Sequence, residues 1–128
     1  MAVLKPSGVE VMDVSSLAAS ATTALGDCDP TDLTKATELC FTIVCTFNAS
    51  ATAGARVTLW PAYDGTNFDS AAWDGWYWDI DVSAGNTVTR TTPALSTVPK
   101  SMKIKVENRD SSYAITSLKA YAIKQSAG

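Results

Sequence analysis

The fold of this chain is constrained most by a two-residue alternation of apolar and polar side chains between residues 39 and 47. One side of the run carries large apolar residues, namely Leu39, Phe41, Ile43, Cys45 and Phe47. The other side carries smaller or polar residues: Cys40, Thr42, Val44 and Thr46. Successive side chains of a strand point to opposite faces of a sheet, whereas a helix repeats about every 3.6 residues. The run therefore predicts a β-strand with one buried face.

The same alternation recurs in three later segments and predicts further strands. Their expected inward residues are Val57 and Leu59, then Trp76, Trp78, Ile80 and Val82, then Met102, Ile104 and Val106. Weaker alternation indicates strands over about residues 15–25 and 86–92. The last run, over residues 113–124, is expected to pair back on the strand before it across a turn at residues 108–111. Only residues 30–35 indicate a helical turn.

Antiparallel strands without helical partners must cover their apolar faces with one another. We therefore expect an all-β protein, an antiparallel β-sandwich or jelly-roll-like fold of about seven to eight strands. The 128 residues are enough for one domain, placed at 14–128 and preceded by an N-terminal arm at 1–13. The expected core residues share the inward positions of the alternation: Phe41, Ile43, Val57, Leu59, Trp78, Ile80, Ile104 and Val106.

The chain contains no histidine, which removes the usual general base and the commonest zinc ligand. The Asp residues follow no pattern that would set one carboxyl against another, and Asp-Gly is foremost a turn signal. Cys28, Cys40 and Cys45 are an odd set and are interpreted as buried thiols. We therefore expect no catalytic residue, no metal and no cofactor. Calcium at Asp64, Asn67 and Asp69 stays open as an alternative to a hydrogen-bonded turn, which the spacing favours.

All four tryptophans and seven of the eleven aromatic residues fall between residues 60 and 80, interleaved with aspartates. Aromatic rings give large contact area and carboxylates accept hydrogen bonds, so this segment is the best candidate for a binding surface. Its candidate binding residues are Trp60, Tyr63, Asp64, Asn67, Asp69, Trp73 and Tyr77. A packed hairpin, a sugar-stacking platform and a protein interface all remain open.

Charge is unevenly distributed along the chain. Residues 1–82 hold eleven acidic and three basic residues, whereas residues 83–128 hold seven basic and two acidic ones, giving −8 and then +5. Either neighbouring strands compensate each other, or an acidic face of one subunit meets a basic face of the next in a homo-oligomer. The candidate basic interface is Lys103, Lys105 and Lys119. The net charge of −3 argues against a nucleic-acid partner.

The first residues, MAVLKPSGVEVMDV, lack the apolar run of a signal peptide, and no later segment has the length of a membrane span. We expect synthesis in the cytoplasm of the producing cell, no secretion and no membrane partner.

Two stretches carry a resemblance to a known class of proteins. They are TELCFTIVCTFNASATAGARVTLWPAYDGTNFDS and the later WYWDIDVSAGNTVTRTTPALSTVPKSMKIKVENRDSSYAITSLKAYAI. Together they cover about residues 36–123, and they resemble small all-β structural proteins encoded in tailed-bacteriophage gene clusters. The resemblance implies a non-catalytic virion component, a capsid decoration (cement) or head or neck accessory subunit. Its implied partners are the major capsid protein or other virion proteins, and copies of itself.

The competing interpretation is a tail-associated carbohydrate-binding or receptor-binding module with a surface glycan as its ligand. Flat rings stack on sugars and adjacent carboxylates accept hydrogen bonds from hydroxyls. Trp60, Trp73, Trp76 and Tyr77 would form the platform. The alternation argues against part of it, since it predicts that Trp76 faces the core.

Overall fold

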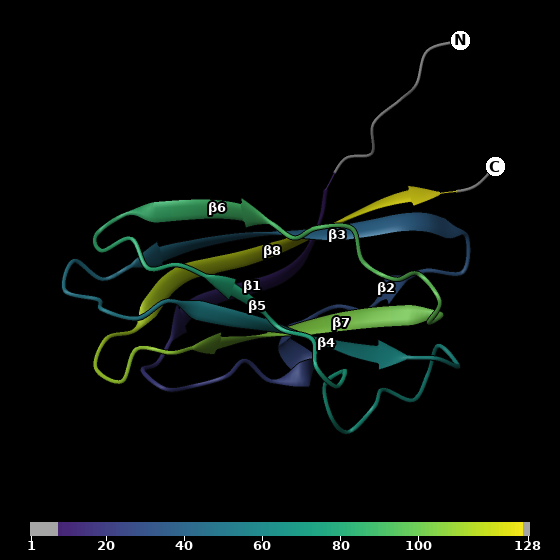
Figure 1. Cartoon of the computed structure of the whole chain (residues 1–128), viewed down its shortest axis with the longest axis horizontal. Helices are drawn as coiled ribbons and strands as arrows, with labels where there is room; N and C mark the ends of the chain where they lie inside the picture. The colour runs from purple at the N-terminus through teal and green to yellow at the C-terminus, as the bar shows by residue number, and fades with distance from the viewer. Residues whose placement is uncertain (1–7, 127–128) are drawn as a thin grey trace, which may run out of the picture.

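The computed structural model describes residues 8–126, and eight strands in this part of the chain form two antiparallel sheets packed face to face (Figure 1). The strands are β1 (Val9–Leu17), β2 (Thr31–Asp32), β3 (Ala36–Phe47), β4 (Ala55–Ala62), β5 (Trp78–Ile80), β6 (Thr87–Thr91), β7 (Ser101–Asn108) and β8 (Ile115–Ser126). A short 3-10 turn, η1, spans Leu25–Asp27. One sheet has the order β1-β8-β3-β6 and the other the order β2-β7-β4-β5.

This strand order is that of a jelly roll. The first strand pairs with the last, and the pairing continues inward as β2 with β7, β3 with β6, and β4 with β5, always antiparallel. These four pairings together form one long antiparallel hairpin. When this hairpin folds over on itself, β3 also pairs with β8 and β4 with β7, which completes the two sheets. The predicted all-β sandwich of seven to eight strands is confirmed.

The hairpin predicted across residues 108–111 is wrong. Strand β7 pairs with β2 and β4, whereas β8 pairs with β1 and β3 in the other sheet, so the chain crosses between sheets at this turn. Two buried polar side chains hold the crossing. The Asn108 amide donates to the carbonyl oxygens of Leu17, Ala18 and Tyr113 at 3.2, 3.2 and 2.9 Å.

Asp110 is the second side chain of this crossing. Its carboxylate accepts hydrogen bonds from the backbone N–H groups of Thr52, Ala53, Ser112 and Tyr113. These hydrogen bonds lower the pKa of Asp110 to about 2, because they stabilise the ionised carboxylate, and the bond from the Thr52 amide has the largest effect. The turn that the sequence predicts at residues 108–111 thus connects the two sheets. The sequence pattern did not reveal this, because a local turn signal does not show which strands the flanking segments pair with.

The N-terminal boundary also differs from the prediction. Residues 9–13, expected in an arm, belong to β1, Gly8 directly precedes that strand, and residues 1–7 of the expected arm lie outside the described residues. A register shift between Glu10 and Met12 turns both Val11 and Met12 inward, which breaks the alternation that would have revealed the strand. Residues 30–35 contain β2 rather than a helical turn.

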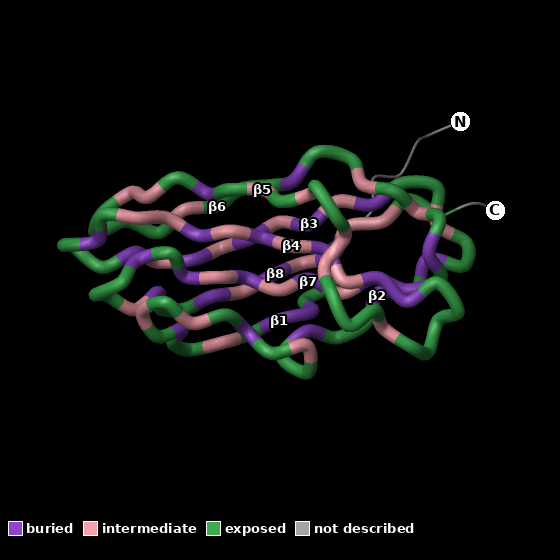
Figure 2. Tube along the Cα trace, turned by 60° about the horizontal axis from the view of Figure 1, so that its bottom comes forward, coloured by how far each residue is buried: buried purple, intermediate pink, exposed green. Residues whose placement is uncertain are grey.

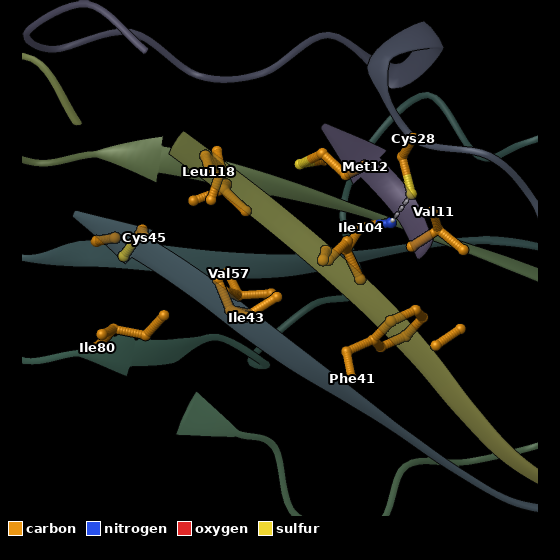
Figure 3. Packing of buried hydrophobic residues seen from close by; sticks show 14 of the residues in the cluster. Val11, Met12, Cys28, Phe41, Ile43, Cys45, Val57, Ile80, Ile104 and Leu118 are labelled. Atoms are coloured by element: carbon orange, nitrogen blue, oxygen red, sulfur yellow. Dashed lines mark hydrogen bonds between the residues drawn. The ribbon is translucent and has the colours of Figure 1, made fainter. Parts of the chain in front are cut away.

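The core lies between the two sheets, as the buried segments in Figure 2 show. Seven of the eight predicted core residues are 2% exposed or less, and Figure 3 shows Phe41, Ile43 and Val57 among the side chains of this core. The exception is Trp78, which is half-buried at the sandwich edge with the Arg90 guanidinium 5.3 Å from its ring centroid. Inward apolar side chains from both sheets therefore form one core, as the alternation predicts.

All three cysteines are free. Cys28 and Cys45 are buried as predicted, and burial raises the pKa of Cys45 to about 11. The Cys28 sulfur accepts a hydrogen bond from the Ile104 amide at 3.5 Å (Figure 3). Cys40 differs from the prediction, because it lies half-buried on the outer face of β3, where Ile123 is its partner.

Candidate functional site

The best candidate site is the outer surface of the sheet β2-β7-β4-β5. Because Val57, Leu59, Ile104 and their neighbours point inward, the alternate residues of β4 and β7 point outward. The pairing register sets Trp60 beside Lys103. We call the surface formed by Arg56, Trp60, Phe68, Tyr77, Lys103 and Lys105 the cation–aromatic face.

Three aromatic rings on this face each form a cation–π contact with a Lys or Arg side chain. The Lys105 ammonium is 3.8 Å from the Trp60 ring centroid. The Arg56 guanidinium is 3.9 Å from that of Tyr77, and the Lys103 ammonium is 4.8 Å from that of Phe68. A cation over the negative face of a ring is attracted by about 0.5–1 kcal/mol at exposed sites and by more when desolvated. These contacts fix long side chains that would otherwise be mobile.

A second set of contacts orients Arg56. Its guanidinium donates to both carboxylate oxygens of Asp79, at 2.7 and 3.0 Å. Arg109 adds longer contacts of 3.7 Å to Asp79 and 4.0 Å to Glu107. The hydrogen bonds from Arg56 lower the pKa of Asp79, and the same bonds raise the pKa of Arg56. A bidentate pair combined with a stacked ring leaves the guanidinium little freedom.

The loop between β4 and β5 supplies Phe68 and Tyr77. It follows the edge of β4, since the amide of Asp69 donates to the Pro61 oxygen (2.9 Å) and that of Trp73 to the Leu59 oxygen (3.1 Å). Figure 1 shows the loop extending beyond the end of β4 before the chain returns to the sheet as β5.

Asp64 and Asn67 form a turn within this loop. One Asp64 carboxylate oxygen accepts from the amides of Thr66 (2.8 Å) and Asn67 (2.7 Å), and the other accepts from the Asn67 side chain (2.7 Å). These donors lower the pKa of Asp64 to about 2. Gly65 adopts the positive φ of 84° that the turn needs. This geometry favours the turn over the calcium alternative, because both carboxylate oxygens already have partners inside the loop.

The predicted aromatic residues do not form a single flat platform. Trp60 is half-buried, donates its indole N–H to Thr58 at 3.0 Å and is covered by Lys105. Tyr63 and Tyr77 are more open, at 50% and 57% exposed. The Tyr63 and Trp73 rings are 6.3 Å apart and inclined by 43°. The rings therefore present separate surfaces.

The predicted basic interface is divided between the two sheets. Lys103 and Lys105 lie among the aromatic residues, whereas Lys119 lies on β8, on the outer face of the other sheet, in register with Asp13 and Val44. The prediction was wrong in joining Lys119 to the others. It also treated the aromatic and basic residues as separate surfaces, although the β4–β7 register brings them together.

Sequence reasoning missed Arg56, Phe68 and Asp79 as members of the site. Arg56 stands at an outward position of a predicted strand, but its partner Asp79 comes from another strand 23 residues later. Only the pairing of β4 with β5 connects them.

No protein-family model and no curated protein matches this chain. Among residues 8–126, no three His, Cys, Asp or Glu side chains gather in a group that could hold a metal ion. None of the helical structure in that range has the length and hydropathy of a membrane span.

Proposed function

We propose that the protein is a non-catalytic structural subunit of a tailed-bacteriophage virion, a capsid decoration (cement) or head or neck accessory protein that binds the capsid lattice through its cation–aromatic face. The sequence resemblance and the jelly-roll order both point in this direction, since jelly rolls recur in viral capsid proteins and lectins. Because one fold serves many functions, the chemistry of the face has to decide.

The observation that carries the proposal is that three cations are held over three rings on one exposed sheet face. Arg, Trp and Tyr are enriched in protein interfaces, where they account for much of the binding energy. Side chains already fixed by stacking lose less conformational freedom on binding, which favours a rigid lattice partner. Lys103 and Lys105 also form no ion pair with a described residue, so they remain available for carboxylates of a capsid protein.

A tail-associated carbohydrate-binding or receptor-binding module is the second candidate. Tyr63 and Trp73 support it, because the exposed Tyr63 ring lies beside the half-buried Trp73 ring near the Asp64 turn. Stacking on a sugar needs a free ring face, however, and Lys105 already covers one face of Trp60. Of the predicted platform, we therefore assign only Trp73 to this alternative, together with Tyr63, which the predicted platform did not include.

Matched charge reversals test the proposal. Lys105→Glu changes the cation–aromatic face, and Lys119→Glu changes an equally half-buried lysine on the outer face of the opposite sheet. We expect Lys105→Glu to weaken binding to purified capsids by about tenfold or more, the usual effect of a hot-spot residue, while Lys119→Glu binds normally.

Tyr63→Ala addresses the alternative. Capsid binding that survives Lys105→Glu, together with glycan binding that Tyr63→Ala abolishes, would replace the proposed function with the carbohydrate-binding one. Thermal unfolding of each variant controls for loss of the fold.

A further inference from the structure

Strands β1 and β2 lie on the side of the sandwich opposite β5 and β6 (Figure 2). Residues of β1, β2 and β8 line a small apolar groove there. It has a volume of about 140 Å³ and is lined mainly by Val9, Val11, Pro30 and Ala122. Cavities of roughly 150 Å³ hold a benzene-sized molecule, so this groove has room for one branched aliphatic side chain. Val9 at its rim is 64% exposed, which is unusual for an inward-facing strand residue.

Thr31 gives a second, independent observation. It lines the same groove, is only 7% exposed, and its hydroxyl has no hydrogen-bond partner among the described residues. A buried hydroxyl without a partner costs free energy, so native proteins satisfy nearly all such groups. The groove can therefore accept an apolar side chain against its lining and a polar group beside the Thr31 hydroxyl. An extended peptide segment offers both, one from a side chain and one from its backbone.

The strand edge beside the groove is open over a short stretch. The amide of Asp29 donates to the Val11 oxygen at 2.7 Å, and Cys28 forms an isolated antiparallel bridge with Met12, so this edge of β1 is occupied at Val11 and Met12. Within residues 8–126, no segment bonds to the corresponding side of Val9 and Glu10. Open edges of this kind accept an added strand. Glu10, Asp29 and Asp32 are the acidic residues around the groove, and Lys124 and Lys100 are the bases that lie beside Asp32.

We propose that this groove receives residues 2–5 of a second copy of the chain, which adds a short strand at Val9 and Glu10. The segment reads Ala-Val-Leu-Lys, and Lys5 is the only base among the first 34 residues. Leu4 fills the groove, a backbone group of the segment bonds to Thr31, and Lys5 meets the acidic rim. Apolar complementarity and charge complementarity thus coincide in four consecutive residues.

A second copy fits better than the chain's own segment. Gly8 still follows the line of β1, because a side-chain carbon placed there would lie 3.2 Å from Tyr121 and 3.6 Å from Ile123 on β8. A return of residues 2–5 to their own groove needs a chain reversal within residues 5–8. The segment of a neighbouring copy needs none.

Self-association of the full chain, measured by sedimentation velocity, tests the proposal with matched variants. Val9→Asp places a charge at the groove. Val98→Asp is the control, because it places the same charge at another exposed valine that does not line the groove. We expect Val9→Asp, and likewise Leu4→Asp, to weaken self-association by about tenfold or more, as loss of an anchor residue does. Val98→Asp should leave it unchanged. Equal behaviour of Val9→Asp and Val98→Asp would overturn the proposal.

Disulfide trapping identifies the segment in the groove. Separately purified Leu4→Cys and Val9→Cys proteins, one of them ¹⁵N-labelled and both carrying Cys40→Ser, are mixed and oxidised. Mass spectrometry should find a disulfide joining positions 4 and 9 between labelled and unlabelled chains. No bond between positions 4 and 9, or bonds only between like positions (4 with 4 or 9 with 9), would refute the second-copy arrangement. Capsid binding plays no part in this readout, so the result is independent of the proposed function.

Discussion

Replacing Ile104 with alanine should remove a large share of the stability of the sandwich. Ile104 is 0% exposed at the centre of β7 and lies opposite Leu59 in the pairing register. The substitution deletes three buried carbons, worth about 2.4 kcal/mol at about 0.8 kcal/mol each. The cavity left between two rigid sheets adds to this, so we expect a loss of about 3–4 kcal/mol in the free energy of unfolding. For a domain of this size, the melting temperature should fall by roughly 10–15 °C.

Urea denaturation followed by tryptophan fluorescence measures this loss. Ile123→Ala is the matched control, because Ile123 is half-buried on the outer face of β8. The control should cost less than about 1 kcal/mol, as substitutions outside the core usually do. Equal costs for the two variants, or a cost below about 1 kcal/mol for Ile104→Ala, would refute the packing of β7 against the opposite sheet.

Three further predictions concern backbone packing, pH and thiol reactivity. Gly54→Ala should cost about 1–3 kcal/mol by thermal unfolding, because the added carbon would lie 1.9 Å from the Ile80 oxygen and force β5 away from β4. The ionised Asp110 carboxylate stabilises the fold at pH values above its usual pKa of 3.8, and this contribution is lost as the pH falls toward its folded-state pKa of about 2. Asp110→Asn has no such carboxylate, so its free energy of unfolding should fall less steeply with acid than that of the wild type. Iodoacetamide at pH 8 should modify Cys40 before Cys45, whose pKa burial raises to about 11; equal rates would contradict the burial.

The strands that the sequence predicts well are those with long, uninterrupted alternation. Leu39 to Phe47 and Met102 to Val106 have this pattern because one face of each strand is buried along its whole length. Strand β1 was misplaced because its bulge turns Val11 and Met12 inward together. Strand β2 has two residues, too few for any period to be visible.

The candidate site could be predicted only in its parts. Composition reveals the aromatic segment, and the charge count reveals the basic C-terminal half. That Lys105 covers Trp60 depends on the β4–β7 register, and that Lys119 faces away depends on the crossing at Asn108. Both are long-range properties that a single strand's pattern does not contain.

Quantitative mass spectrometry of purified virions tests the central claim most directly. The proposed function implies a phage as the source of the gene; that phage is grown with the wild-type protein, with Lys105→Glu or with Lys119→Glu, and copies per particle are counted against the major capsid protein. We predict wild-type copy numbers comparable with those of the major capsid protein, and a clear loss for Lys105→Glu but not for Lys119→Glu. Particles that lack the protein, or that carry both variants at wild-type level, would contradict a lattice-binding role for the cation–aromatic face.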